Sequence, residues 1–215
     1  MSDGKTGKDE RRAAILKVAR EVFLSDGYAA ASMSHIAARV GGSKATLYNY
    51  FPSKKDLFFA VSEADSVRMM DQLFQFDDII GDVFECVRLF CRRLVDVVLH
   101  DDMLALYRLI VAESVRFPEI GLAAYETGYG PGMKRMAGLL QMAMDQGHLR
   151  KANPHKAAEL VFELCQGCLH DYCLWGVRQN IPPEEIIAAA DQAAAVFLTV
   201  YGTDDVAAEA RAKIV

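Results

Sequence analysis

The sequence has little proline and no long run of uncharged apolar residues, and these two scarcities narrow the class of protein. Only 6 of the 215 residues are proline, and alternating apolar and polar residues of the kind that form strands are rare, so we expect an all-α fold. The most apolar stretch, residues 186–202, is interrupted by Asp191 and Gln192, whereas a membrane helix needs roughly 18 apolar residues. The charged N-terminus has no apolar signal core, so a cytoplasmic protein is expected.

Disulfide frameworks and catalytic motifs are also missing. Five cysteines are an odd number in a chain of which 52% is apolar, and this favours free thiols in a reducing compartment. The sequence has no nucleophile elbow, no phosphate-binding glycine loop and no pair of metal ligands spaced along a helix. We therefore expect neither an enzyme nor a bound cofactor.

The net charge of −5 is unevenly distributed along the chain. Residues 1–60 carry ten basic and six acidic side chains, which gives +4 there and leaves −9 for the remainder. A basic segment on an acidic body concentrates the attraction for a polyanion at one end of the chain. Nucleic acid is the partner that this asymmetry indicates.

Two short helices joined by a glycine turn are predicted within the basic segment. Ser32 is a good N-cap for the first helix, which Gly41-Gly42 ends, and Ser43 caps a second helix that runs to about Tyr50. Such a pair is a helix-turn-helix unit, whose second helix enters the major groove of DNA.

A longer helix is expected on each side of this pair. The preceding helix is predicted over residues 9–25 and ends before Gly27, which can adopt a left-handed conformation. The following helix is predicted over residues 54–70, with Ser53 and Asp56 as its capping box. We place the domain boundary after this cap, which gives a DNA-binding domain over residues 1–55 and a second domain over residues 56–215.

The second domain is predicted to consist of further helices. They are expected over residues 79–99, 102–116, 119–129, 133–147, 154–178 and 183–201. The helix at 119–129 should end at Gly130-Pro131-Gly132, and that at 154–178 should be continuous.

An ordered set of residues between positions 10 and 60 goes beyond the helix-turn-helix pattern. It comprises Ala19, Phe23, Gly27, Tyr28, Ser34, Ile36, Ala37, Gly41, the run from Ser43 to Phe51, Ser53, Lys54 and Leu57. This set resembles the DNA-binding domain of the TetR family of bacterial transcriptional regulators. The resemblance implies about nine helices, a homodimer and a C-terminal domain that binds a small ligand. Gly42 departs from it, because the family usually has a small apolar residue there, and a looser turn is expected.

The predicted recognition helix carries polar and basic groups that suit DNA better than a core. The candidate DNA contacts are Ser32, Ser34, Lys44, Ala45, Thr46, Tyr48, Asn49, Tyr50 and Lys54. Leu47 and Phe51 are expected in the core instead, and Ser32 could be no more than an N-cap. Two recognition helices about 34 Å apart in a dimer would read a palindrome.

Two sets of residues in the second domain are candidates for a dimer interface and a ligand pocket. The predicted dimer interface consists of Val161, Cys165, Cys168, Tyr172, Ala190, Ala193 and Phe197. The candidate ligand pocket consists of Phe90, Tyr107, Arg108, Phe117, Tyr125, Met142, His170 and Trp175. Periodicity alone does not distinguish either set from the core of one chain.

The leading hypothesis is a ligand-responsive repressor that binds a palindromic operator as a homodimer, without a membrane partner. Its effector is an unknown small molecule. The alternative is a metal- or redox-responsive helical protein that uses Cys165, Cys168 and Cys173. Structural zinc prefers ligands in turns, however, and buried cysteines ordinarily act as small apolar residues.

Overall fold

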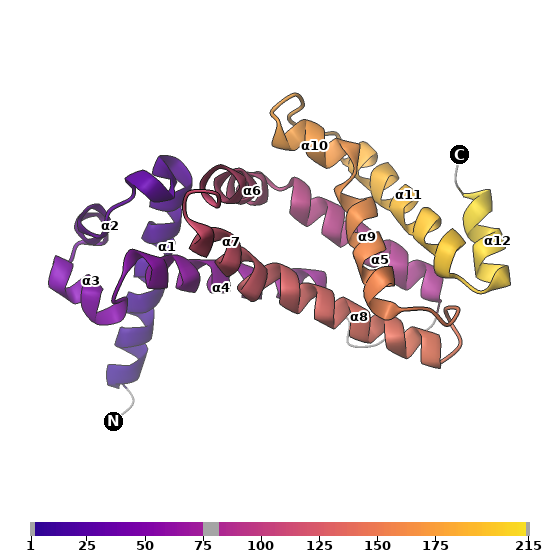
Figure 1. Ribbon diagram of the computed structural model, residues 1–215, viewed down its shortest axis with the longest axis horizontal. Coiled ribbons are helices and arrows are strands. Elements are labelled where there is room, and N and C mark those ends of the chain that lie inside the picture. Colours follow the sequence, from indigo (N-terminus) through magenta and orange to yellow (C-terminus); the bar gives the residue numbers. More distant parts are fainter. Residues whose placement is uncertain (1–2, 75–81, 214–215) are drawn as a thin grey trace. The chain divides into compact units, whose positions relative to one another are not determined.

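The structure of the chain is a computed structural model that describes residues 3–74 and 82–213, with side chains described from residue 7 onward (Figure 1). Every regular element in these residues is a helix, apart from an isolated bridge between Leu149 and Gly202. The all-α class is therefore confirmed, although the chain divides into more helices than the nine or so expected. Positions 79–81 of the predicted helix 79–99 lie outside the described residues.

The helices form two compact units, each built from two separate segments of the chain. The first, here called the head, consists of Met1–Arg68 and Ala105–Tyr129. The second, here called the body, consists of Met69–Leu104 and Gly130–Val215. The predicted domains were contiguous segments, so neither coincides with one of these units.

The head contains the helix-turn-helix unit and the helices that support it. Its elements are α1 (Asp3–Ala30), α2 (Met33–Val40), α3 (Lys44–Tyr50), most of α4 (Lys54–Leu73), most of α6 (Asp101–Glu113), α7 (Pro118–Ala124) and the π-helix η1 (Tyr125–Tyr129). One apolar cluster joins Phe23, Ile36 and Leu47 of the first three helices to Leu109 and Ile120 of α6 and α7. The helix-turn-helix unit therefore shares its core with residues that lie far away in the sequence.

Helix α1 extends past the end predicted for it. It is kinked at Gly27, whose φ of 79° and ψ of 162° are not helical. Backbone of this kind is essentially restricted to glycine. The predicted stop at Gly27 is thus a change of direction, after which a last turn runs to Ala30.

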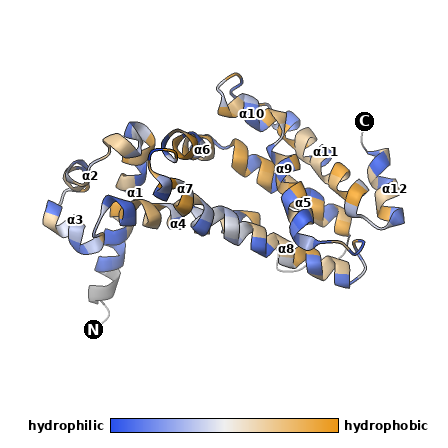
Figure 2. Cartoon of the chain, viewed as in Figure 1, coloured by the Kyte–Doolittle hydropathy of each residue, from blue (hydrophilic) through white to orange (hydrophobic). Residues whose placement is uncertain are grey.

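The body is a bundle around α5. Its elements are α5 (Val83–Leu99), α8 (Gly130–Asp145), α9 (Pro154–Gln166), α10 (Cys168–Leu174), α11 (Pro183–Tyr201) and α12 (Asp204–Ala212). Helix α5 packs against α9 and α11, and hydrophobic residues run along most of α11 (Figure 2). Phe90, Leu94, Ala158, Ala194 and Phe197 are among the buried residues of this core. The alanines of α11 have small side chains, which allows neighbouring helices to approach closely.

The predicted break at Gly130-Pro131-Gly132 does not occur. Helix α7 passes into η1 and then directly into α8, so the chain stays helical from Pro118 to Asp145. Pro131 has no N–H to donate to the preceding turn. The wider π-helical turn just before it is the kind of local adjustment that accommodates such a residue.

The predicted continuous helix 154–178 is wrong as well. It ends at Gln166, and Gly167 (φ −31°, ψ −164°) separates α9 from the short helix α10. The expected apolar stripe through Val161, Cys165 and Cys168 is consequently divided between two helices.

Candidate nucleic-acid interface

Serine side chains set the start of both helices in the helix-turn-helix unit. Ser32 Oγ accepts a hydrogen bond from the His35 N–H at 3.1 Å, and Ser43 Oγ accepts one from the Thr46 N–H at 3.0 Å. Gly41 ends α2 in the left-handed conformation, with φ of 72°. The predicted caps are therefore confirmed, and Ser32 has a structural role whether or not it also contacts DNA.

Helix α3 has one buried side and one exposed side. Leu47 and Phe51 are buried in the core of the head, as expected. Lys44, Ala45, Tyr48 and Asn49 are exposed. The exposed side therefore offers a cation, a small apolar group, a phenol and an amide, which suit the edges of bases.

The other predicted contacts of the unit are less available. Thr46 and Tyr50 are half-buried, and the Thr46 hydroxyl lies 2.8 Å from Ser43 Oγ. Ser34 is exposed on α2. Lys44 Nζ lies 5.8 Å from the centre of the Tyr48 ring, so these two side chains form a cation–π pair on the exposed side.

Lys54 lies differently from the expectation that it faces phosphate. Its Nζ donates to the carbonyl oxygens of Tyr28 at 2.7 Å, Ala31 at 3.1 Å and Ala29 at 3.3 Å. It also lies 4.4 Å from the centre of the Tyr28 ring. An ammonium group has three donors, and here all three have backbone acceptors.

Carboxylates of α6 and α7 complete this connection between α1 and α2. Glu113 Oε1 accepts from the Ala29 N–H at 3.0 Å, and the Tyr28 hydroxyl donates to Glu119 Oε1 at 3.3 Å. Burial and the negative charge of Glu119 raise the pKa of Tyr28 to about 12. Burial lowers the pKa of Lys54, although Glu113 and Glu119 oppose this effect.

Several basic side chains of the head are held by partners within it. Arg20 Nε donates to Asp65 at 2.8 Å, and Arg39 Nη2 pairs with Glu21 at 3.0 Å. Arg11 instead donates from Nη2 to the Gly41 carbonyl oxygen in the turn between α2 and α3, at 3.2 Å. Arg11 was not among the predicted contacts, because nothing in the sequence indicates that α1 reaches this turn.

The predicted ligand residues are divided between the two units. Tyr107, Arg108, Phe117 and Tyr125 belong to the head, whereas Phe90, Met142, His170 and Trp175 belong to the body. Phe117 packs edge-on against Tyr28 at 5.2 Å and so supports the core of the head. Tyr125, Met142 and Trp175 are exposed. His170 is buried, and burial lowers its pKa.

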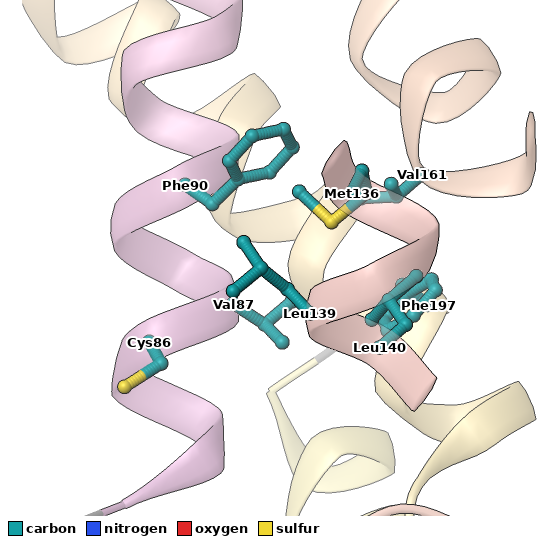
Figure 3. A pocket seen from close by; sticks show the side chains of 8 residues that line it. All are labelled: Cys86, Val87, Phe90, Met136, Leu139, Leu140, Val161 and Phe197. Carbon is teal, nitrogen blue, oxygen red and sulfur yellow. The ribbon is translucent and has the colours of Figure 1, made fainter. Parts of the chain in front are cut away.

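A small apolar cavity lies in the body, and only Phe90 of the predicted pocket residues lines it. The other lining residues are Cys86, Val87, Met136, Leu139, Leu140, Val161 and Phe197 (Figure 3). Its volume is about 20 Å³, enough for a water-sized molecule. Sequence reasoning missed most of these residues because they repeat at ordinary core spacing.

Most of the predicted dimer interface lies inside a single chain. Val161, Cys165, Ala190, Ala193 and Phe197 are buried in the core of the body. A side chain that is covered within one chain has little surface left to offer to a second chain in this conformation. Cys168 and Tyr172 are exposed.

The cysteines do not form a metal site within the described part of the chain. Cys165 is buried on α9 and Cys173 on α10, whereas Cys168 is exposed. Among the described residues, no group of three or more His, Cys, Asp or Glu side chains is arranged to hold a metal ion. A hydrogen bond with Cys165 and burial raise the pKa of Cys91 well above its ordinary value.

None of the helices among the described residues combines the length and the apolarity that crossing a bilayer requires.

Comparisons with known proteins identify both parts of the chain. Residues 15–61 match the family model of bacterial regulatory proteins of the tetR family, and residues 85–203 match that of the C-terminal domain of AefR-like transcriptional repressors. The HTH-type transcriptional activator FasR from Mycolicibacterium smegmatis is 52% identical over 54 residues, which are 25% of either chain. This chain thus spans only about a quarter of that relative.

Solved structures match over nearly the whole chain. A putative TetR-family regulator from Mesorhizobium loti superposes with a TM-score of 0.82 and 26% identity, covering 91% of this chain and 98% of the other. A flavonoid-responsive regulator, FrrA, gives a TM-score of 0.79 and 29% identity, covering 91% and 99%.

Proposed function

Because the chain belongs to the tetR family of bacterial regulatory proteins, we propose that it is a repressor that binds a palindromic operator as a homodimer. A small molecule bound in the body releases it from DNA, and it acts in the cytoplasm, where DNA lies. The exposed side of α3 carries this proposal, since Lys44, Tyr48 and Asn49 have no part in the core. Repression is chosen over activation because the family model that matches residues 85–203 describes repressors.

In the proposed complex, the first turns of α3 enter the major groove. Lys44 bonds guanine or phosphate, Ala45 contacts a thymine methyl group, and Tyr48 and Asn49 contact base edges. Ser34, at the start of α2, contacts phosphate and sets the register. Lys54 acts by fixing the connection between α1 and α2, because its donors are already bonded there.

The DNA-binding proposal is tested with the full chain and the palindromes next to its coding region. Lys44→Ala should weaken operator binding and flatten the dependence of log K on log salt by about one unit if the contact is phosphate. Lys55→Ala is the matched control, because Lys55 is an exposed lysine outside α3. A wild-type protein with no preference for any duplex over random competitor would contradict the proposal.

An apolar surface on the body supports the proposed homodimer. Tyr172, Trp175 and Val177, on α10 and the segment after it, and Ile187 on α11 are all exposed. Trp175 and Val177 each expose more than two thirds of their surface, at 68% and 69%. Exposed apolar groups mark interaction sites where they form a patch, and we propose these residues for the interface in place of the buried ones.

We propose the apolar cavity lined by α5, α8, α9 and α11 as the effector site. Ligand pockets usually measure about 300–1,000 Å³, so the effector must select a more open state of the body. An apolar, ring-bearing molecule fits the lining of Phe90, Met136 and Val161, and FrrA, a relative in structure, is described as flavonoid-responsive. A coupling of about 1–3 kcal/mol would change operator affinity 5- to 150-fold.

The effector proposal is tested by adding a flavonoid to the operator complex and following DNA release by fluorescence anisotropy. A saturated fatty acid serves as the comparison probe, and release by the fatty acid alone would contradict the ring-bearing class. Met136→Ala should lower the flavonoid concentration required, because it enlarges the cavity. Met142→Ala, on the exposed side of the same helix, should not change it.

A further inference from the structure

The guanidinium of Arg11 lies beside the turn that precedes the recognition helix. It donates to the Gly41 carbonyl oxygen at 3.2 Å. Gly41 and Gly42 directly precede Ser43, the N-cap of α3. Thus a cation from α1 is held next to the residues that present α3 to DNA.

Gly42 provides the room for this contact. A Cβ atom at position 42 would lie 2.7 Å from Arg11 Nη2 and 3.9 Å from Arg11 Cζ. Gly42 does not have positive φ, unlike Gly41, so its backbone does not require glycine. The guanidinium occupies the space beside position 42 and forms a hydrogen bond with the turn at Gly41.

Most of the hydrogen-bonding capacity of Arg11 remains for another acceptor. A guanidinium has five N–H donors in a planar fork that matches phosphate, and the Gly41 carbonyl uses one of the two nitrogens at its tip. Arg20 and Arg39 are paired with Asp65 and Glu21. Among the described side chains, no carboxylate forms an ion pair with Arg11.

Acidic and basic side chains both adjoin Arg11 in the sequence, because Asp9 and Glu10 precede it and Arg12 follows it. The first described turns of α1 are hydrophilic (Figure 2), and Arg12 follows directly, with its guanidinium 5.5 Å from the Phe51 ring. Lys44 opens α3 three residues after Gly41. A basic group fixed at the edge of a reading helix is suited to the DNA backbone, where such contacts set register rather than sequence preference.

We propose that Arg11 is a phosphate-contacting residue of the operator complex, oriented by the Gly41 carbonyl and accommodated by Gly42. This inference rests on the proposed DNA-binding function. It adds a contact from α1 to those of α2 and α3.

The test uses the full chain and salt-titrated binding to the operator and to random duplex. Arg11→Met keeps the aliphatic stem and removes the guanidinium. It should weaken binding to both duplexes by a similar factor. It should also reduce the slope of log K against log salt by about one unit. Lys17→Met, at an exposed lysine of the same helix, is the matched control and should change the slope less.

Gly42→Ala provides a second, independent variant. Its Cβ should displace the guanidinium, and combining it with Arg11→Met should produce no further loss, because both remove one contact. A slope unchanged by Arg11→Met, or additive effects of the two substitutions, would overturn the inference. If the wild-type protein shows no operator preference, the proposed function fails rather than this contact.

Discussion

Lys54 shows how a long cationic side chain can serve the fold from a position that sequence reasoning assigns to DNA. Its stem allows the ammonium group to reach either solvent or the core. Three carbonyl oxygens at the end of α1 and just after it accept hydrogen bonds from the ammonium group. The motif predicts that a lysine stands here, but the direction of its side chain depends on the kink at Gly27.

Replacing Lys54 should therefore affect stability more than DNA electrostatics. We expect Lys54→Met to lower the free energy of unfolding by about 1 kcal/mol, because two partly buried carbonyl groups lose their donor. Urea unfolding gives this difference, and Lys55→Met is the exposed neighbour for comparison. A salt slope reduced by one unit in Lys54→Met, without loss of stability, would restore the phosphate role.

Tyr28 makes the head sensitive to alkaline pH. Its pKa is about 12 in the folded chain, against an ordinary value of 10.0, so the folded state holds the phenol proton more tightly. This contribution to stability is complete below pH 10.0 and is lost as the pH rises towards about 12. Tyr28→Phe should therefore flatten the decline of unfolding free energy over this range.

The measurement compares urea unfolding of wild type and Tyr28→Phe at pH values on either side of 10. Tyr125→Phe is the control, because Tyr125 is exposed. An equal alkaline decline in all three proteins would contradict the assignment of the shift to Tyr28.

Helix starts were predicted well where a side chain defines them locally. Ser32 and Ser43 bond the N–H groups of their own first turns, and Ser53 bonds that of Asp56. Helix ends inside apolar sequence were predicted poorly. Neither Gly167 nor the Gly130-Pro131-Gly132 run shows by itself whether a helix ends there, because packing against neighbouring helices decides this.

Helix α7 contributes to the head although it lies outside the residues that resemble the DNA-binding domain. Ile120 is fully buried in the core of the head, whereas Leu122, two residues later, is 47% exposed. We expect Ile120→Ala to destabilise the head by about 2–5 kcal/mol, as in other large-to-small core substitutions.

The Ile120 prediction has a local readout. Hydrogen exchange of residues 15–61 should accelerate in Ile120→Ala and stay close to wild type in Leu122→Ala. Faster exchange restricted to residues 118–124 would show that α7 does not support the helix-turn-helix unit.

The fluorescence of Trp175, the single tryptophan of the chain, should report on dimer formation. Trp175 exposes 68% of its surface in the body of one chain, so a dimer that covers it should shift its emission to shorter wavelength and protect it from quenching by iodide. Dilution should reverse both effects together with the sedimentation coefficient. A dimer by sedimentation whose Trp175 remains fully quenchable would place the interface elsewhere.

Apolar periodicity predicts which faces of the body helices are buried, but not which helices cover those faces. Val161 and Phe197 belong to apolar stripes with the helical spacing expected at a dimer interface. The same spacing results when helices of one chain cover each other. The pocket residues were predicted from side-chain size, which does not fix location: the chain places Phe117 in the core of the head and Trp175 at the surface.

The sharing of Leu109 and Ile120 with α1 to α3 bears on attempts to exchange specificities between regulators. A chimera joined at the end of the motif, near residue 61, would combine the helix-turn-helix unit of one regulator with the α6 and α7 core residues of another. The part of the chain that must be exchanged is discontinuous. Residues 105–129 should be transferred together with the helix-turn-helix unit if the hybrid is to recognise the donor's operator.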